Sequence, residues 1–404
     1  MQINRGYKFL LRPTSVQMAA MEQHASICRL IYNLAVEQRR DHYRQFQRAM
    51  GRPISFATQC LELTKLRAEF EWLSAVSLTA QQQALRDVQS AYQNFFSGRS
   101  EYPSFRKKGI NESFRFQGRE VSFRRLNKSW GIVKLPKIGD VRFRWTRDIP
   151  GKLKNVTIIL DPLGWHVSFS TEQDVEVLSN FRPALGVDRG IVEPIAYSDG
   201  TFADFPIARI KALDKRARKA AQVASRGKKG SNRRKVAKAR VAANRAKLAR
   251  VRTHFNHVET ARLARMFGVI CLEALKIRNM TASARGTIDA PGTNVAQKRG
   301  LNRSIMEIGW YQFEQFLTYK IVAAGGEIRH VNAAYTSTTC SCCGLNEKTN
   351  RKSQAVYECA GCGSAMSADT NAAINILRAG TRPAQDRRVA AKRKSTLEVE
   401  ATAA

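Results

Sequence analysis

The stretch ALGVDRGI, residues 184–191, ends an apolar run on a single carboxylate, Asp188. Two later stretches have a similar texture: FGVICLEAL at 267–275 and GEIRHVN at 326–332. Short apolar runs that are separated by long helical patterns are typical of strands in an α/β domain. We therefore expect an α/β fold from about residue 183, in which Asp188 lies at the end of a strand.

The charge balance predicts a polyanionic partner. The 404 residues include 68 Lys and Arg against 33 Asp and Glu, a net charge of +35, and 43% of them are hydrophobic. That much apolar material supports packed cores, so we expect a globular basic protein. Such an excess of bases favours nucleic acid, through release of counterions from phosphates, over a membrane surface. The chain has no window of 18 uncharged apolar residues and no signal-peptide pattern at its start, which predicts an intracellular protein without a membrane segment.

The N-terminal part begins with a short strand pattern, GYKFLLRP, and continues with helical periodicity. Thr14 or Ser15 can cap the first helix with its side-chain oxygen. Apolar residues recur at intervals of three and four from about residue 18 to 46, and again from 78 to 96. Residues 14–97 are therefore predicted to form a helical insert.

From residue 98 to 180 the pattern changes to alternation, as in SFRFQ, WGIVKLP, VRFRW and NVTIILD. Alternation of this kind predicts an antiparallel sheet, here a small barrel. The strands interleave Arg and Lys with Phe and Trp, which suits a surface that follows phosphates and stacks on bases. A sheet with an apolar inner face and a solvated basic outer face is an equally open interpretation.

Residues 209–252 carry eighteen Lys or Arg and one acid, Asp214, in two Ala-rich helical stretches broken at SRGKKGSNRRK. A charge run is usually a solvated face, but like charges on a helix destabilise it unless an anion neutralises them. We therefore expect this segment to bind nucleic acid. Residues 379–404 contain few large apolar residues, which predicts a disordered tail.

Five of the eight cysteines crowd into residues 340–362. Two CxxC pairs, separated by fifteen residues, have the spacing of a four-sulfur zinc site, in which each pair aims two thiolates at one point. Such a closed site leaves no position for a substrate, so the metal would be structural. The predicted ligands are Cys340, Cys343, Cys359 and Cys362.

Two alternatives remain open for this site. Cys342 could replace Cys343, although only Cys343 has the two-residue gap from Cys340 and the following Gly344 that the turn favours. His330, ten residues upstream of the first cysteine, could supply a ligand, but ordinary packing or a surface position is the simpler role for it.

Three acids stand in apolar settings: Asp188, Glu273 in FGVICLEAL, and Asp369 in GSAMSADTNAAINIL. A buried carboxylate is costly unless it is paired or bound to metal, and each acid taken singly could have an Arg, Lys or backbone partner. Together, in one α/β region, they favour a cluster for Mg²⁺ or Mn²⁺. Two such ions about 4 Å apart can activate water and stabilise a leaving oxygen in phosphodiester hydrolysis.

Taken in order, these motifs resemble TnpB, the IS200/IS605-type transposon-encoded family related to Cas12 nucleases. GVDRGI, YSDGT, ICLEALKIRNM and SADTNAAINIL resemble its three RuvC motifs, and TSTTCSCCG through CAGCG its embedded zinc ribbon. YKFLLRPT, CRLIYNLAVEQ, AYQNFF, YPSFRKK, GSNRRK and GWYQFEQFLTYK follow the family's order, so the resemblance covers nearly the whole chain.

The resemblance implies an RNA-guided DNA endonuclease of a bacterial or archaeal cytosol, whose partners are a noncoding guide RNA from the transposon end and double-stranded target DNA. It implies Asp188, Glu273 and Asp369 as catalytic acids and the four predicted cysteines as zinc ligands. We expect an α+β multidomain fold, and a monomer is favoured although the sequence does not fix the oligomeric state. The implied domains are a wedge β-barrel (1–13 and 98–180), a helical recognition insert (14–97), an RNase H-like RuvC domain (181–335 and 365–378), a zinc ribbon (336–364) and the tail (379–404).

The residues that would read the target-adjacent motif match no family pattern. The candidates for nucleic-acid contact are amide side chains, basic side chains and one tyrosine: Tyr32, Asn33, Gln81, Gln82, Gln83, Arg106, Lys107, Arg233, Arg234 and Lys235. Two positions depart from many relatives: Ala368, where a larger polar residue is common, and Arg189, where a small or apolar one is. Alternation along the strand predicts that Arg189 points away from the face of Asp188.

Three other functions compete with a TnpB-type nuclease. A cleavage-deficient RNA-guided repressor is disfavoured because all three acids are retained. A compact Cas12-type CRISPR effector has the same chemistry and differs in genomic neighbourhood. A strand-transfer transposase is least favoured, because the chain has no His-hydrophobe-His and Tyr nucleophile pattern.

Overall fold

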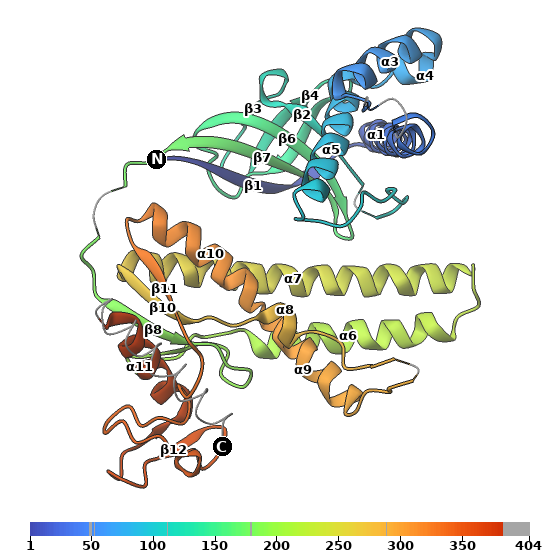
Figure 1. The fold of residues 1–404 in the computed structure, drawn as a ribbon. Helices are drawn as coiled ribbons and strands as arrows, with labels where there is room; N and C mark the ends of the chain where they lie inside the picture. The colour runs from blue at the N-terminus through green and yellow to red at the C-terminus, as the bar shows by residue number, and fades with distance from the viewer. Residues whose placement is uncertain (48–50, 52, 111, 178–179, 288, 383–404) are drawn as a thin grey trace. The chain divides into compact units, whose positions relative to one another are not determined.

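The computed structural model describes residues 1–47, 51, 53–110, 112–177, 180–287 and 289–382. The chain divides into two compact units, Met1–Val175 and the segment that starts at Glu176 (Figure 1).

The first unit is built on a seven-stranded antiparallel sheet with the order β2-β6-β7-β1-β5-β4-β3. All the strand patterns predicted between residues 98 and 180 are strands. The bounds of the seven strands are β1 Gln2–Arg12, β2 Glu112–Gln117, β3 Ser122–Arg125, β4 Trp130–Leu135, β5 Gly139–Arg144, β6 Lys152–Asp161 and β7 Gly164–Asp174.

The sheet curls around an aromatic core. Phe9, Phe143 and Phe169 are buried, because alternate residues of β1, β5 and β7 point inward. The ring of Phe123 on β3 lies 4.8 Å from that of Phe169 on β7, so one end of the sheet folds over its middle. Within the described residues the two end strands, β2 and β3, do not pair with each other. The sheet is therefore barrel-like without the closed ladder that a barrel implies.

Helices lie between the first two strands, as the periodicity predicts. They are α1 (Ser15–His42), which continues as the π-helical turn η1 (Tyr43–Gln47), then α3 (Phe56–Glu69), α4 (Glu71–Ser74) and α5 (Leu78–Phe96). Thr14 caps α1, and its side chain and that of Gln17 satisfy each other's backbone amides. α1 and α5 pack on each other and on β2. The prediction included no helix at α3.

The second unit has a four-stranded sheet with the order β11-β10-β8-β9. β8 (Ala184–Asp188), β10 (Val269–Glu273) and β11 (Glu327–Val331) are parallel, and the short β9 (Ala196–Tyr197) is antiparallel to β8. The α/β fold expected from residue 183 is confirmed. The parallel order puts the carboxyl ends of β8, β10 and β11 at one edge.

Helices cover both faces of this sheet, and alternation along the strands decides which residues meet them. Leu185, Val187, Ile270 and Leu272 pack against α7 (Asn232–Met266) and α10 (Trp310–Ala323). Gly186 and Cys271 face the opposite side, where α11 (Ala368–Thr381) packs on β8 and β10. Asp188 and Glu273 continue the α11-side rows. The strand pattern thus directs both acids to one face.

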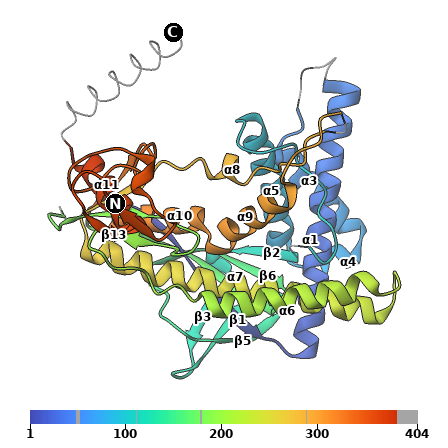
Figure 2. The same ribbon diagram turned by 90° about the horizontal axis from the view of Figure 1, so that it is seen from below.

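Two basic helices project from this unit as a hairpin. α6 (Ile207–Arg226) and α7 lie side by side in Figures 1 and 2 and are joined at residues 227–231, within the predicted break. Ser231 caps α7. α8 (Ile277–Met280) and α9 (Val295–Ile308) follow β10.

A small ribbon is inserted between β11 and α11. It contains the turn η3 (Lys348–Asn350) and a hairpin of β12 (Val356–Glu358) and β13 (Ala365–Ser367). The tail predicted from about residue 379 overlaps the last residues of α11, which continues to Thr381, and Gly380 packs closely on Cys271. Residues 383–404 lie outside the described part of the chain.

Candidate active site and zinc ribbon

The three predicted acids gather where β8, β10 and α11 meet. Val187 pairs with Leu272 across the parallel strands, so Asp188 and Glu273 follow as neighbours at the carboxyl edge of the sheet. Asp369 lies in the first turn of α11, which covers that face. A Cβ atom at Gly190 would lie 3.7 Å from Oδ2 of Asp369, so this carboxylate lies over the chain just beyond Asp188.

The electrostatics show that these acids interact. Burial, together with the negative charges of Glu273 and Asp369, raises the pKa of Asp188 to about 7, although the Arg189 amide and the charge of Arg351 oppose the shift. Burial also raises the pKa of Asp369, with Arg351 opposing and Glu193 adding to the shift. Burial is the largest cause of both shifts, and a bound cation would stabilise the charged form of these carboxylates.

Two further side chains touch the acids, and both come from the segment that includes the ribbon. The hydroxyl of Thr336 donates to Oε1 of Glu273 at 2.6 Å. Nη2 of Arg351 lies 3.7 Å from Oδ1 of Asp369. Sequence reasoning missed both residues, because neither carries a motif signal and only the packing of the ribbon brings them to the acids.

The donor chemistry fits hard divalent cations, since the site offers carboxylate oxygens and no thiolate or imidazole. Among the described residues, the four cysteines form the group of ligand atoms that all lie within 4.8 Å of one another, and the three acids do not belong to such a group. Mg²⁺ keeps several water ligands, so carboxylates that hold it need not converge on one point as thiolates around zinc do.

The ribbon brings Cys340, Cys343, Cys359 and Cys362 together. Sγ of Cys343 lies 3.5 Å from Sγ of Cys359, and Sγ of Cys340 lies 3.7 Å from Sγ of Cys362. Each CxxC pair ends in a glycine with positive φ, Gly344 at 83° and Gly363 at 68°, which lets the knuckle turn without a Cβ penalty.

The two alternative ligands, Cys342 and His330, do not belong to this group of four cysteines. Cys342 is exposed and lies outside the group of four. Burial opposes ionisation of the Cys340 thiol, but hydrogen bonds from the backbone amides of Cys343 and Cys342 and from the thiols of Cys359 and Cys362 lower its pKa to about 6. Nε2 of His330 lies 2.9 Å from Oε1 of Glu314 on α10, and not at the cysteines.

The two departures from the family pattern have structural explanations. Arg189 points to the α10 side, opposite Asp188, as alternation predicts, and donates to Glu314 and to the backbone carbonyl of Glu273, each at 2.6 Å. Ala368 is fully buried in the ribbon core with Cys340 and Tyr357.

Three family models match the chain. They are described as "Cas12f1-like, TNB domain" (residues 310–376), "Probable transposase" (168–284) and "Helix-turn-helix domain" (1–48). The first spans α10, β11, the ribbon and most of α11, and the second spans β8 and β10. Within the described part of residues 1–48, the elements are a strand followed by one long helix.

Curated relatives match over nearly full length. "Putative RNA-guided DNA endonuclease InsQ" from Escherichia coli (strain K12) is 34% identical over 378 residues, which are 93% of this chain and 92% of that protein. The chain belongs to the TnpB family. A second relative, "Putative RNA-guided DNA endonuclease" from Streptomyces pristinaespiralis, is 29% identical and covers 94% of this chain and 90% of its own.

Solved structures share the fold of this TnpB-family chain. The protein in "Cryo-EM structure of the Cas12f1-sgRNA-target DNA complex" aligns with a TM-score of 0.57 at 14% identity, over 89% of this chain and 82% of that one. The protein in "Structure of the mini-RNA-guided endonuclease CRISPR-Cas_phi3" aligns with a TM-score of 0.51 at 12% identity, over 95% of this chain and 93% of that one. None of the described helices has both the length and the apolar character needed to cross a membrane.

Several nucleic-acid candidates of the TnpB-family chain have internal partners. Gln81 is fully buried and donates to the carbonyl of Leu73, and Gln83 is 5% exposed. The side chain of Asn33 exchanges hydrogen bonds with the backbone of Arg106, whose guanidinium lies 3.9 Å from the centre of the Tyr32 ring. The side-chain amides of Asn33 and Gln81 thus have partners within the protein, and contact of these residues with nucleic acid stays a prediction.

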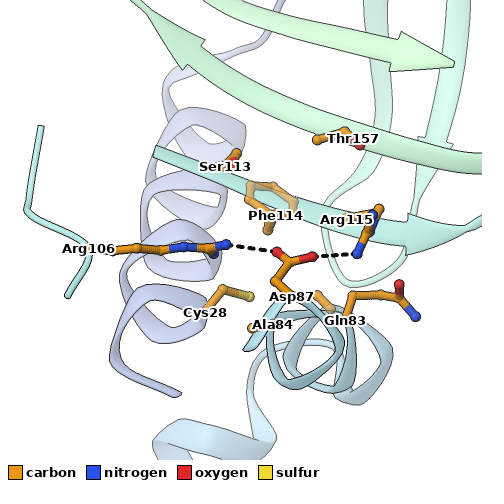
Figure 3. A pocket seen from close by; sticks show the side chains of 10 residues that line it. Cys28, Gln83, Ala84, Asp87, Arg106, Ser113, Phe114, Arg115 and Thr157 are labelled. Carbon is orange, nitrogen blue, oxygen red and sulfur yellow. Dashed lines mark hydrogen bonds and ion pairs between the residues drawn. The ribbon is translucent and has the colours of Figure 1, made fainter. Parts of the chain in front are cut away.

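Figure 3 shows this packing from close by. Arg106 and Arg115 both pair with Asp87 on α5, and the three side chains line a cavity of about 70 Å³ together with residues that include Cys28 and Phe114. Because three glutamines follow one another at 81–83, the sequence alone does not indicate which of them faces the core. In the structure Gln81 and Gln83 point inward. Gln82 is half-buried.

The remaining basic candidates are accessible. Lys107, Arg233 and Lys235 are exposed, and Arg234 is half-buried and donates to the carbonyl of Gly227. Most bases of 209–252 are likewise exposed on the α6–α7 hairpin. These positions keep their predicted role as possible phosphate contacts.

Proposed function

We propose that this TnpB-family protein is an RNA-guided DNA endonuclease that hydrolyses phosphodiester bonds at the cluster of Asp188, Glu273 and Asp369. The supporting observation is their convergence: acids from β8, β10 and α11, which lie up to 181 positions apart in sequence, meet at one sheet edge, where burial and the charges of Glu273 and Asp369 raise the pKa of Asp188. In a chain of net charge +35, such a site suits a polyanionic substrate.

The three carboxylates would hold two Mg²⁺ or Mn²⁺ ions, which when bound activate water and stabilise the leaving oxygen. Thr336 fixes one carboxylate oxygen of Glu273 through its hydroxyl. Arg351 adds a positive charge next to Asp369, where it would attract a phosphate oxygen of the DNA strand.

We assign the second unit to an RNase H-like RuvC domain (181–335 and 365–378) that carries the ribbon (336–364) as an insertion. A zinc ion on the four cysteines would hold the ribbon structurally, and the ribbon in turn presents Thr336 and Arg351 to the acids. In the first unit, the sheet (1–13 and 98–180) would be the wedge and the helices (14–97) the recognition domain. A guide RNA from the transposon end would select the target, next to a short motif, and exposed bases such as Lys107 and Lys235 would contact phosphates.

Cleavage by the purified RNA-bound protein tests this function. With Mg²⁺, the wild type is expected to cut a plasmid that matches the guide, and Asp188→Ala to abolish cutting while RNA-dependent target binding persists. A wild type that binds the guided target without cutting it would make the protein a repressor. A wild type that cuts equally well without RNA would reject guided cleavage.

A further inference from the structure

Arg189 is a buried arginine beside the acid cluster that the cleavage chemistry does not use directly. It directly follows Asp188, yet its side chain, 1% exposed, lies on the α10 side of the sheet. Nη1 donates to Oε2 of Glu314 and Nη2 donates to the backbone carbonyl of Glu273, each at 2.6 Å. One guanidinium therefore connects the end of β8, the end of β10 and helix α10.

Glu314 joins a fourth element to this connection. Its Oε1 accepts from Nε2 of His330 on β11 at 2.9 Å. Val331, the next residue on β11, is the register partner of Glu273. The carboxyl ends of β8, β10 and β11 are thus linked through one carboxylate on α10, which we call the Arg189–Glu314–His330 bridge.

We propose that the Arg189–Glu314–His330 bridge is a positioning device for the metal-binding acids. Because Arg189 holds the carbonyl of Glu273 and Thr336 holds its carboxylate, this acid is fixed at both ends. Glu314 also neutralises Arg189 on the far side of the sheet, so that its charge does not compete with cations for Asp188 and Glu273. This inference rests on the proposed metal-dependent nuclease function.

The alternative is an ordinary buried ion pair that only stabilises the fold. Against it, Arg189 donates to the backbone carbonyl of Glu273 as well as to the carboxylate of Glu314, and charge neutralisation alone does not require the first contact. The two acceptors also require the planar fork of arginine, since a lysine nitrogen at the end of a single stem reaches both positions poorly. Residues that orient metal ligands typically change metal affinity about 10- to 100-fold when altered.

The test compares Arg189→Lys with Arg262→Lys in the RNA-bound protein. Arg262 pairs with the buried Glu259 at 2.6 Å in the same unit, makes no hydrogen bond to the three acids within the described residues, and is the control for loss of an arginine fork. Mn²⁺ binding is followed by the electron paramagnetic resonance signal of the free ion, together with thermal melting and guided-target binding. Asp188→Ala defines the Mn²⁺ bound at the cluster.

Arg189→Lys is expected to weaken the Asp188-dependent Mn²⁺ binding by about 10- to 100-fold with target binding retained. Arg262→Lys is expected to leave Mn²⁺ affinity unchanged, even if its melting temperature falls as far. Wild-type Mn²⁺ affinity in Arg189→Lys overturns the bridge, whereas a wild type without Asp188-dependent Mn²⁺ binding overturns the nuclease assignment itself.

A double-mutant cycle makes the result independent of any one variant. Glu314→Gln is expected to weaken Mn²⁺ binding in the wild type but to add nothing in the Arg189→Lys background, because both changes break the same bridge. His330→Ala removes a side chain that is 45% exposed, so it disturbs the core less than the other two changes. It is expected to weaken Mn²⁺ binding too, but by a smaller factor. Additive effects of Glu314→Gln and Arg189→Lys, or an unaltered His330→Ala, would contradict the coupling.

Discussion

Gly186→Ala offers a sharp test of how the fold holds the acid cluster. Gly186 lies on β8, two residues before Asp188, and α11 packs directly on it. A Cβ atom at 186 would lie 2.1 Å from the carbonyl oxygen of Ala373 and 2.8 Å from Cβ of Leu377, whereas real Cβ contacts are essentially never shorter than 3.0 Å. The neighbour is backbone, so the helix itself must retreat by at least 0.9 Å, the difference between these distances.

That retreat has two measurable consequences. Overpacking of a well-packed core costs about 1–3 kcal/mol of unfolding free energy. Because Asp369 is in the first turn of α11, the shift also moves it relative to Asp188, and a displacement of about 1 Å at reacting groups can lower the rate about 100-fold. We therefore expect guided cleavage by Gly186→Ala to fall by about two orders of magnitude, with RNA-dependent target binding retained.

Gly300→Ala is the matched control for the same substitution. Gly300 is exposed on α9, and a Cβ there meets nothing within 4 Å. Removing a helical glycine stabilises by about 0.5–1 kcal/mol, so this variant should melt at or above the wild-type temperature and cleave normally. Cleavage rates, measured under single-turnover conditions, decide the matter. Wild-type cleavage and melting in Gly186→Ala would refute the packing argument.

Two further predictions follow from the acids and the cysteines. Asp188 loses its proton near pH 4 when unfolded but near pH 7 when folded, so the metal-free protein loses stability as the pH rises through this window. Asp188→Asn should therefore be more stable than the wild type at pH 8, by an unfolding free energy on the order of a few kcal/mol, and should melt at a higher temperature. At pH 4 the two proteins should melt at the same temperature. Cys359→Ser should lower bound zinc and loosen residues 336–369, whereas Cys342→Ser should leave zinc content unchanged; equal zinc in both variants would reject the proposed ligand set.

Local spacing explains why the cysteines and the strand ends were predictable. A CxxC knuckle is built from four consecutive residues and a following glycine, so its geometry is already present in the sequence. Likewise, alternation within β8 and β10 sets which face Asp188 and Glu273 occupy, and it correctly directed Arg189 to the other face.

Contacts across long separations explain what the sequence left open. Gln81 is polar but lies on the inner face of α5, and only the packing of α3, α4 and α5 gives its amide partners among Leu73 and Arg67. The last turn of α11, which extends past residue 379, packs closely through Gly380 on Cys271, which lies more than a hundred residues earlier. Neither contact leaves a local pattern.

Local sequence patterns by themselves therefore indicate which residues can bind zinc, which acids end strands, and which helices carry the basic charge. The arrangement of that chemistry belongs to the tertiary structure. Thr336 and Arg351 reach the acids because the ribbon folds back on α11, and Glu314 and His330 reach Arg189 because α10 and β11 pack beside β10. Each of these contacts depends on the packing of elements distant in sequence, and packing free energy is shared by the whole core rather than encoded at any one position.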